Sequence, residues 1–250
     1  MIIITADDYG KTRQATDGIL RCFSAGRITS ASAMVFMEDS QRAAPRALAA
    51  GLEAGLHINL TMPFSSDRAA PGVRHHHGRV AAYLAKNKLA QIVCNPLLAG
   101  SFDYLFQAQR DEFVFLYGRE PGFYNGHHHM HLCANMLMGK IIPEGARVRR
   151  TFTFDPGERP FVNLFYRRLL DRIVDRRYVS TDFFFGLLPL QDHERLRGIF
   201  RRALSRQVEM EVHPENADER EFLCGDPFLT LMGSASLGGF RELAGRGRRI

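Results

Sequence analysis

Three short polar segments interrupt the apolar runs of this 250-residue chain, at points where buried strands should end. They read ITADDYG at 4–10, GLHINLT at 55–61 and NGHHHMHL at 125–132. Carboxylates and imidazoles are the usual protein ligands of a divalent metal ion that activates a water molecule. Three such segments in one chain therefore predict a metal-dependent hydrolase.

The first two segments supply Asp7, Asp8 and His57. Adjacent residues of an extended chain point to opposite sides, so one carboxylate could bind metal while the other faces the substrate water. An Asp pair after a strand is also a common helix cap, and a lone histidine in an apolar strand is often a hydrogen-bonded core residue. The metal site is favoured by the two segments together rather than by either alone.

The third segment is the strongest single signal. If it is a strand, His127, His129 and His131 share one face. Three imidazoles on an inward face suit a metal ion whose ligands are held by further hydrogen bonds. The alternative is a surface histidine patch, which the apolar residues around the segment disfavour.

A fourth candidate, His213, follows the run VEMEV at 208–212, at another predicted strand end. An imidazole can act as a general acid near neutral pH. Glu209 and Glu211 lie on the same face of the predicted strand, so one of them could orient the imidazole. A purely structural histidine is the alternative.

Apolar runs and helical periodicity alternate along the chain. Strands are predicted at 2–6, 30–36, 54–60, 123–133, 147–154, 179–186 and 207–213. Helices are predicted at 14–25, 39–51, 102–117, 161–176 and 192–206, with a loop at 62–80 and a helical stretch from there to about Lys88. The loop contains His75, His76 and His77, which we place on the surface or on a lid over the substrate.

This alternation predicts one α/β domain over residues 1–250, a distorted or incomplete (β/α) TIM-like barrel with mostly parallel strands. Chemistry in such barrels occurs at the C-terminal strand ends, which is where the polar segments fall. A doubly wound open sheet is the alternative, but the expected glycine fingerprint is missing from the sequence.

Composition is that of a soluble globular protein, with 45% hydrophobic and 24% charged residues. No apolar stretch reaches the roughly 20 residues of a membrane span. Met1 leads directly into an apolar run without the features of a signal peptide, so we expect a cytoplasmic protein. The four cysteines form no CxxC pair, which is typical of reduced thiols.

The net charge is +6, and most of the positive charge is arginine. Solvated helix faces are the simpler interpretation, whereas the C-terminal cluster of Arg246, Arg248 and Arg249 is the best candidate for weak contact with an anionic membrane. No nucleic-acid motif accompanies the charge, so a nucleic-acid partner is not expected. The sequence leaves a homo-oligomer open.

Taken in order, TADDYG, GLHINLT, NGHHHMHL and EVHP resemble the motifs of the YdjC/ChbG–HpnK family of carbohydrate deacetylases. The resemblance runs from residue 2 to about 240, and the ordered set is more specific than any one motif. It implies a distorted (β/α) barrel that removes the N-acetyl group of an amino sugar, such as a chito-oligosaccharide or another acylated glycan, and releases acetate. It also implies a divalent metal ion, magnesium or zinc, with manganese and cobalt as alternatives.

The resemblance implies a role for each matching residue. Asp8, His57 and His127 would bind the metal, Asp7 would be the general base and His213 the general acid.

Arg149 loosely matches an arginine that the family places near the substrate, and we also expect His129 and His131 to contact the substrate. The chain departs from the family at Asn125, where the usual residue is Asp, so that the shape is kept but the charge is lost. It also departs at Lys11-Thr12 and in the 62–100 region, whose loops would shape specificity.

Two rival functions follow from the same residues. A non-catalytic protein could use the metal pocket to hold a sugar or lipid-linked ligand, and Asn125 favours it, whereas Asp7 and His213 argue against it because binding alone needs neither an acid nor a base. Alternatively, the deacetylase could act on an amino sugar carried by a lipid or hopanoid, an idea motivated by the arginine-rich surface.

Overall fold

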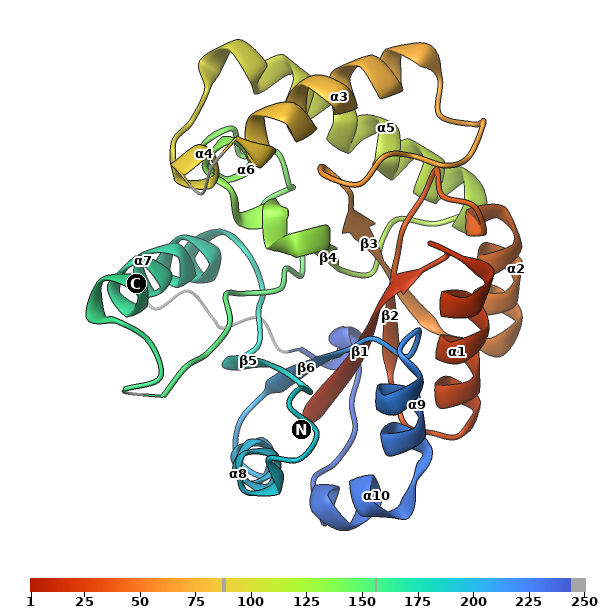
Figure 1. The fold of residues 1–250 in the computed structure, drawn as a ribbon, viewed down its shortest axis with the longest axis vertical. Coiled ribbons are helices and arrows are strands. Elements are labelled where there is room, and N and C mark those ends of the chain that lie inside the picture. The colour runs from red at the N-terminus through yellow and green to blue at the C-terminus, as the bar shows by residue number, and fades with distance from the viewer. Residues whose placement is uncertain (87–88, 156, 244–250) are drawn as a thin grey trace.

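A computed structural model describes residues 1–86, 89–155 and 157–243. Six parallel strands form one sheet in the order β4-β3-β2-β1-β6-β5 (Figure 1). The strands are β1 (Ile2–Tyr9), β2 (Ser30–Ala33), β3 (Glu53–Ile58), β4 (Tyr124–Gly126), β5 (Phe183–Gly186) and β6 (Val208–Val212). The α/β fold is an incomplete TIM-like barrel, as the alternation of strands and helices predicts.

Helices surround the sheet, with α3 and α5 on one side of β3 and β4 and α1 and α2 beside β1 and β2 (Figure 1). The α-helices are α1 (Arg13–Ser24), α2 (Ser40–Ala50), α3 (Pro71–Ala85), α4 (Leu89–Ile92), α5 (Ala99–Tyr117), α6 (Ala134–Met138), α7 (Phe161–Arg177), α8 (His193–Ala203), α9 (Ala217–Cys224) and α10 (Asp226–Met232). The 3-10 helices are η1 (Pro96–Leu98), η2 (His127–Leu132) and η3 (Phe240–Glu242).

The centre of the sheet is β1, which pairs with β2 on one side and β6 on the other. Every residue of Ile2–Tyr9 is buried, as expected of a parallel strand that is covered on both faces. The apolar core holds this strand firmly, and its carboxyl end carries Asp7 and Asp8. The buried central strand of the sheet therefore positions the two carboxylates.

The predicted strand at 147–154 is not a regular strand in the described chain. It instead makes isolated bridges, in which Tyr124 N donates to Arg147 O at 2.8 Å and Val148 N donates to Val179 O at 2.9 Å. Further along, Thr153 N donates to Phe184 O of β5 at 2.8 Å. The segment thus links the two edge strands, β4 and β5, and places Arg149 inside the barrel.

The prediction of one strand over 123–133 was wrong. β4 ends at Gly126, and His127–Leu132 form the 3-10 turn η2, in which His128 and His129 have positive φ values of 53° and 59°. A Cβ at Gly126 would lie only 2.8 Å from the backbone nitrogen of His131, so glycine permits this tight turn. The alternation expected of a strand is lost, and the histidines do not share a face.

The prediction of a loop at 62–80 was also wrong for the second half of this segment. Residues Pro71–Ala85 form α3. Pro71 is at the start of the helix, where a backbone N–H would have no intrahelical acceptor, so the lack of this group in proline costs no hydrogen bond. His77 is buried, and His76 Nδ1 lies 3.0 Å from Ser101 Oγ of α5. The predicted end of this helix, about Lys88, lies outside the described residues.

Candidate active site

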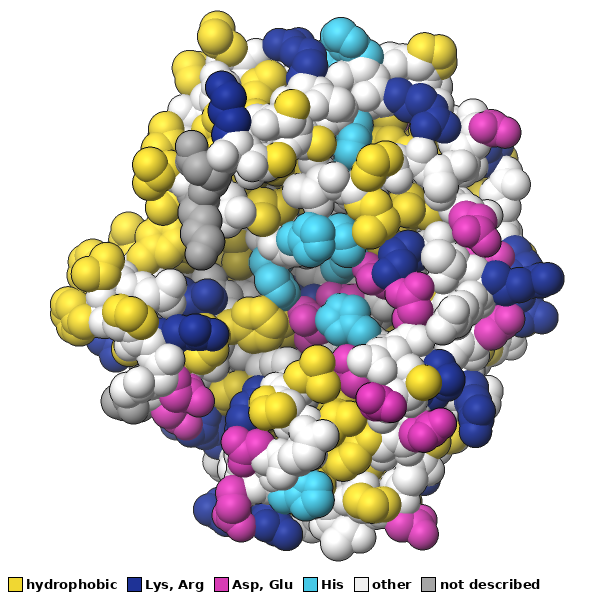
Figure 2. Space-filling model, viewed as in Figure 1, with side chains coloured by type: hydrophobic (Ala, Val, Ile, Leu, Met, Phe, Trp, Pro, Cys, Tyr) yellow, Lys and Arg dark blue, Asp and Glu magenta, His cyan; other side chains and the backbone are white. Residues whose placement is uncertain are grey.

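The candidate site lies at the carboxyl ends of four parallel strands of the sheet. β1 supplies Asp7 and Asp8, β3 supplies His57, the turn after β4 supplies His127, and His213 follows β6. Figure 2 shows histidine side chains gathered at the centre of one face of the molecule, beside acidic side chains. The fold therefore brings together the five residues predicted to bind metal or to transfer protons.

The backbone at Asp8 brings both carboxylates to one side. Asp8 has a φ of +69°, and the pairing of β1 with β2 is irregular between Ala6 and Tyr9. As a result, Asp7 Oδ2 lies 3.9 Å from His57 Nδ1 and Asp8 Oδ1 lies 3.4 Å from His57 Nε2. The expectation that the two side chains point to opposite sides was therefore wrong. Such left-handed non-glycine residues are uncommon and concentrate at functional sites.

Asp8, His57 and His127 form a cluster with the character of a metal site. Asp8 Oδ1 lies 3.4 Å from His57 Nε2 and 3.2 Å from His127 Nδ1. Ligand atoms about 2.0–2.2 Å from one ion stand about 3.0–3.5 Å apart, so this spacing fits. All three residues are buried, and among the described residues Asp8 Oδ1 has no hydrogen-bond partner. A buried carboxylate oxygen without a partner is unfavourable, and a metal ion would satisfy it.

The other oxygen of the Asp8 carboxylate is held by Lys11, whose Nζ lies 2.8 Å from Oδ2. Burial opposes ionisation of Asp8, but the neighbouring imidazoles of His127 and His57 outweigh burial and lower the pKa of Asp8 below its ordinary value. The carboxylate is therefore ionised, as a metal ligand must be. Lys11, one of the departures from the family pattern, thus contacts the Asp8–His57–His127 cluster directly.

Arg149 is completely buried between three carboxylates. Its Nη1 and Nη2 donate to the two oxygens of Asp7 at 2.5 and 2.9 Å. Its Nε donates to Glu209 Oε1 at 2.7 Å, and Nη1 also donates to Glu211 Oε2 at 2.9 Å. Burial opposes the guanidinium charge, but the carboxylates of Asp7, Glu209 and Glu211 outweigh it and raise the pKa of Arg149.

This ion cluster holds Asp7 in place as an anion. Burial would raise the pKa of Asp7, but the positive charge of Arg149 outweighs it and lowers the pKa below its usual range. Two parallel hydrogen bonds from one guanidinium also fix the plane of the carboxylate. Arg149, predicted to bind substrate, is fully buried behind Asp7, so its contacts support a role in positioning Asp7.

A second cluster consists of Asp7, Glu211 and His213, whose polar atoms lie within 4.8 Å of one another. Glu209 and Glu211 both accept hydrogen bonds from Arg149, but of the two only Glu211 belongs to the cluster with His213, so it is the acid that could orient this imidazole. Burial and the nearby charge of Asp7 raise the pKa of Glu211 to about 7. Glu211 can therefore hold a proton near neutral pH, next to the predicted general acid.

The raised pKa of Glu211 predicts a pH-dependent stability. Between pH 4.5 and about 7, folded Glu211 holds a proton that the unfolded chain has released, so the free energy of unfolding falls as the pH rises. For a shift of this size the loss is about 3 kcal/mol across the window. Glu211→Gln should remove this decline, measured by urea unfolding of metal-stripped protein at both ends of the window.

The control for this prediction is Glu194→Gln, which changes an exposed carboxylate on α8. We expect this variant to keep the decline of the parent protein. A Glu211→Gln protein with an unchanged pH dependence would show that Glu211 ionises normally.

The remaining histidines of the third segment have separate positions. His131 is fully buried, and its Nε2 lies 3.0 Å from Arg149 O. Burial lowers the pKa of His131 to about 3. His129 Nε2 lies 3.7 Å from Glu211 Oε2, and its ring meets the edge of Phe152. His129 thus borders open space near the second cluster, whereas His131 supports the backbone behind the site.

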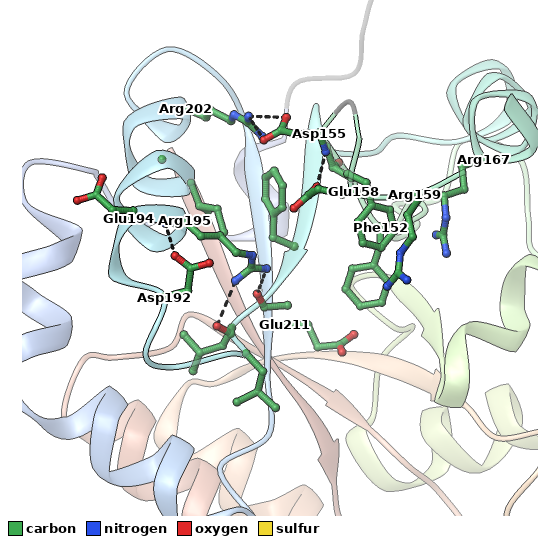
Figure 3. A pocket seen from close by; sticks show the side chains of 18 of the residues that line it. Phe152, Asp155, Glu158, Arg159, Arg167, Asp192, Glu194, Arg195, Arg202 and Glu211 are labelled. Atoms are coloured by element: carbon green, nitrogen blue, oxygen red, sulfur yellow. Dashed lines mark hydrogen bonds and ion pairs between the residues drawn. The ribbon is translucent and has the colours of Figure 1, made fainter. Parts of the chain in front are cut away.

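A cavity of about 590 Å³ extends from the second cluster. Glu211 lies at its lower end in Figure 3, the Arg202–Asp155 pair lies at its top, and Arg159 and Arg167 line one side. His213 and the stacked ring of Phe152 also border it. Its volume is that of a small-molecule site. Acidic, basic and aromatic side chains together suit a polar ligand with apolar faces, such as a sugar.

The model of the YdjC-like protein family matches residues 1–233. The chain belongs to this family. A chitooligosaccharide deacetylase of Serratia marcescens is 30% identical over 135 residues, which are 53% of this chain and 51% of the relative. A human carbohydrate deacetylase is 31% identical over 136 residues, which are 52% of this chain and 41% of the relative.

The alignments with these curated relatives therefore span about half of their length or less. A crystal structure of a candidate cellobiose-phosphate cleavage protein from Enterococcus faecalis V583 has a TM-score of 0.65 and 18% identity, covering 97% of this chain and 98% of that chain. This likeness shows that the two proteins share a fold. In the described part of this YdjC-like chain, no helix is long and apolar enough to cross a membrane.

Sequence reasoning missed several contacts of the site. Ser32 contacts Asn125, Lys11 contacts Asp8, and Glu209 contacts Arg149. The period of two in β6, which places Glu209 and Glu211 on one face, was a usable signal for the last contact. The contact of Ser32 with Asn125 joins β2 to β4, which no local pattern reports, whereas Lys11 lies only three residues after Asp8 in the turn that follows β1.

Proposed function

We propose that this chain is a divalent-metal-dependent carbohydrate N-deacetylase that hydrolyses the N-acetyl group of an amino sugar. The observation that carries the proposal is the buried Asp8–His57–His127 cluster, in which Asp8 Oδ1 has no hydrogen-bond partner, beside Asp7 and His213. The names of the curated relatives, chitooligosaccharide and carbohydrate deacetylases, support the same reaction.

The metal would be held by Asp8, His57 and His127, and when bound it supplies a water of lowered pKa. Two imidazoles with one carboxylate favour zinc over magnesium. Asp7, held ionised by Arg149, is positioned to accept a proton from the attacking water.

Two further residues would assist departure of the leaving amine. His213 lies in the second cluster and would give a proton to the departing amine of the sugar, since amines leave only when protonated. Glu211, which can hold a proton near neutral pH, would orient the imidazole of His213 or return a proton to it. The cavity lined by Glu211, His213 and Phe152 would hold the sugar, and the ring of His129 lies against Phe152.

The test is acetate release from N-acetylated chito-oligosaccharides by metal-stripped protein, with magnesium, zinc, manganese or cobalt added back. We expect release that depends on the added metal and is fastest with zinc. Release without metal, or metal binding without release from any acylated amino sugar, would contradict the proposal. The second result would favour the non-catalytic binding protein instead.

Three predictions from the sequence concern membrane contact, oligomeric state and cellular location. Weak contact with an anionic membrane depends on Arg246, Arg248 and Arg249, which lie outside the described residues. A homo-oligomer is compatible with α7, whose Phe161, Val162 and Phe165 are exposed. A cytoplasmic location stays a prediction from the sequence.

A further inference from the structure

Asn125, at the middle of β4, lies at a point where three polar groups meet. It is fully buried, and its two terminal atoms face different partners. One terminal atom lies 2.7 Å from His57 Nδ1. The other lies 2.7 Å from Ser32 Oγ and 3.0 and 3.1 Å from Nη2 and Nη1 of Arg149. One of these atoms is the amide oxygen and the other is the NH2 group, so two arrangements exist.

The Arg149 side of the amide decides between the two arrangements. A guanidinium only donates hydrogen bonds, so an amide NH2 facing Arg149 would place donor against donor. With the oxygen on that side, Asn125 accepts from both Arg149 nitrogens and from Ser32 Oγ, and its NH2 donates to His57 Nδ1. Two of its bonds come from the charged guanidinium, and they outweigh the 3.5 Å approach of the amide oxygen to Asp7 Oδ1.

The choice of arrangement sets the tautomer of His57. When Nδ1 accepts a hydrogen bond from Asn125, a neutral imidazole carries its proton on Nε2. Nε2 is the atom that lies 3.4 Å from Asp8 Oδ1, inside the metal cluster. A metal ion needs the lone pair of this nitrogen, and the imidazole would then carry its proton on Nδ1.

We propose that Asn125 holds metal-free His57 in the tautomer with the proton on Nε2, and so weakens metal binding. Loading would require the amide to turn by 180° as Nε2 loses a proton and Nδ1 gains one. The turned amide would place its NH2 against Arg149. This proposal rests on the proposed metal site, which it deepens by naming the residue that regulates its affinity.

A carboxylate at position 125 has no such conflict. One oxygen can accept from His57 Nδ1–H while the other accepts from Arg149 and Ser32. Outer partners of metal-binding histidines typically change metal affinity about 10–100-fold. We therefore expect Asn125→Asp to bind zinc about 10–100-fold more tightly than the parent protein, measured by competition with a chelator.

The decisive measurement is the tautomer itself, since added negative charge could also tighten binding. Nitrogen NMR of metal-free protein, at a pH where the imidazole is neutral, should show the His57 proton on Nε2 in the parent and on Nδ1 in Asn125→Asp. Lys11→Met is the matched control, because it also makes the cluster more negative by one charge but leaves Asn125 unchanged. We expect Lys11→Met to keep the proton on Nε2.

A proton on Nδ1 in the metal-free parent protein would overturn the inference, and this measurement needs no variant to fold. Equal zinc affinity of the parent and Asn125→Asp would also overturn it while leaving the deacetylase proposal intact. Zinc binding that survives His127→Ala would instead contradict the metal site, and the tautomer measurement would still decide the role of Asn125.

Discussion

Asp7→Asn should bind its metal ion with nearly unchanged stoichiometry and yet release acetate at least about 100-fold more slowly than the parent protein. A positioned general base typically contributes about 10²–10⁴-fold to a rate, and an amide cannot accept the proton. The side chain keeps its shape, so the amide oxygen of the variant can still accept a hydrogen bond from Arg149. Initial rates of acetate release and metal content by elemental analysis, on the same preparation, check the prediction.

The control for this variant separates lost proton transfer from a disturbed Arg149. Glu209→Gln removes a different carboxylate from the same guanidinium, since Arg149 Nε donates to Glu209 Oε1 at 2.7 Å. Its expected loss of rate is clearly smaller than that of Asp7→Asn. Equal losses in both variants would assign the effect to Arg149, and near-normal turnover by Asp7→Asn would exclude Asp7 as the base.

His127→Ala should lose the metal ion, and with it the activity. Removing one of three ligands should weaken binding by at least about 100-fold, the upper end of the effect seen when only an outer partner is removed. The measurement is zinc affinity together with the metal content of the purified protein. Unchanged metal content in His127→Ala would contradict the assignment of Asp8, His57 and His127 as ligands.

His128→Ala is the matched control for this experiment. His128 follows His127 directly and its ring lies 4.0 Å from that of His127, but its Nδ1 contacts Thr61 Oγ1 at 3.1 Å rather than Asp8. We expect His128→Ala to retain metal. A loss of metal in both variants would point to general damage to η2 rather than to a missing ligand.

Local sequence patterns predicted most of the fold. The apolar run at 2–6 predicted β1 because a parallel strand covered on both faces must be apolar throughout. The helix predicted at 102–117 was confirmed as α5 (Ala99–Tyr117), and Asp192 caps α8 by accepting from Arg195 N. Helical and strand periods are properties of a short stretch of chain, so a single sequence reveals them.

The secondary-structure predictions were wrong where the residue composition of a segment did not indicate its backbone conformation. The segment at 62–80 has the residues of a loop, yet its second half is helical because Pro71 suits the first turn of a helix. The histidine segment after β4 looked like a strand, but Gly126 allows the chain to turn at once into η2. Neither outcome could be read from residue types alone.

The sequence by itself determined which side chains were available and the order of strands that carries them to one edge of the sheet. Asp8, His57, His127, Asp7 and His213 follow from that order, since the C-terminal ends of parallel strands meet on one side. Their types alone also limited the chemistry to metal binding and proton transfer.

Only the tertiary structure decided how these side chains are paired. The positive φ of Asp8 turns its carboxylate toward His57. The charge of Arg149 outweighs burial and lowers the pKa of Asp7, whereas burial and the charge of Asp7 raise the pKa of Glu211. Asn125 contacts His57, Ser32 and Arg149 at once because β4, β3, β2 and the 147–153 segment meet around it. Hydrogen-bond direction and pKa depend on neighbours that are distant in the chain, so they emerge only when the barrel forms.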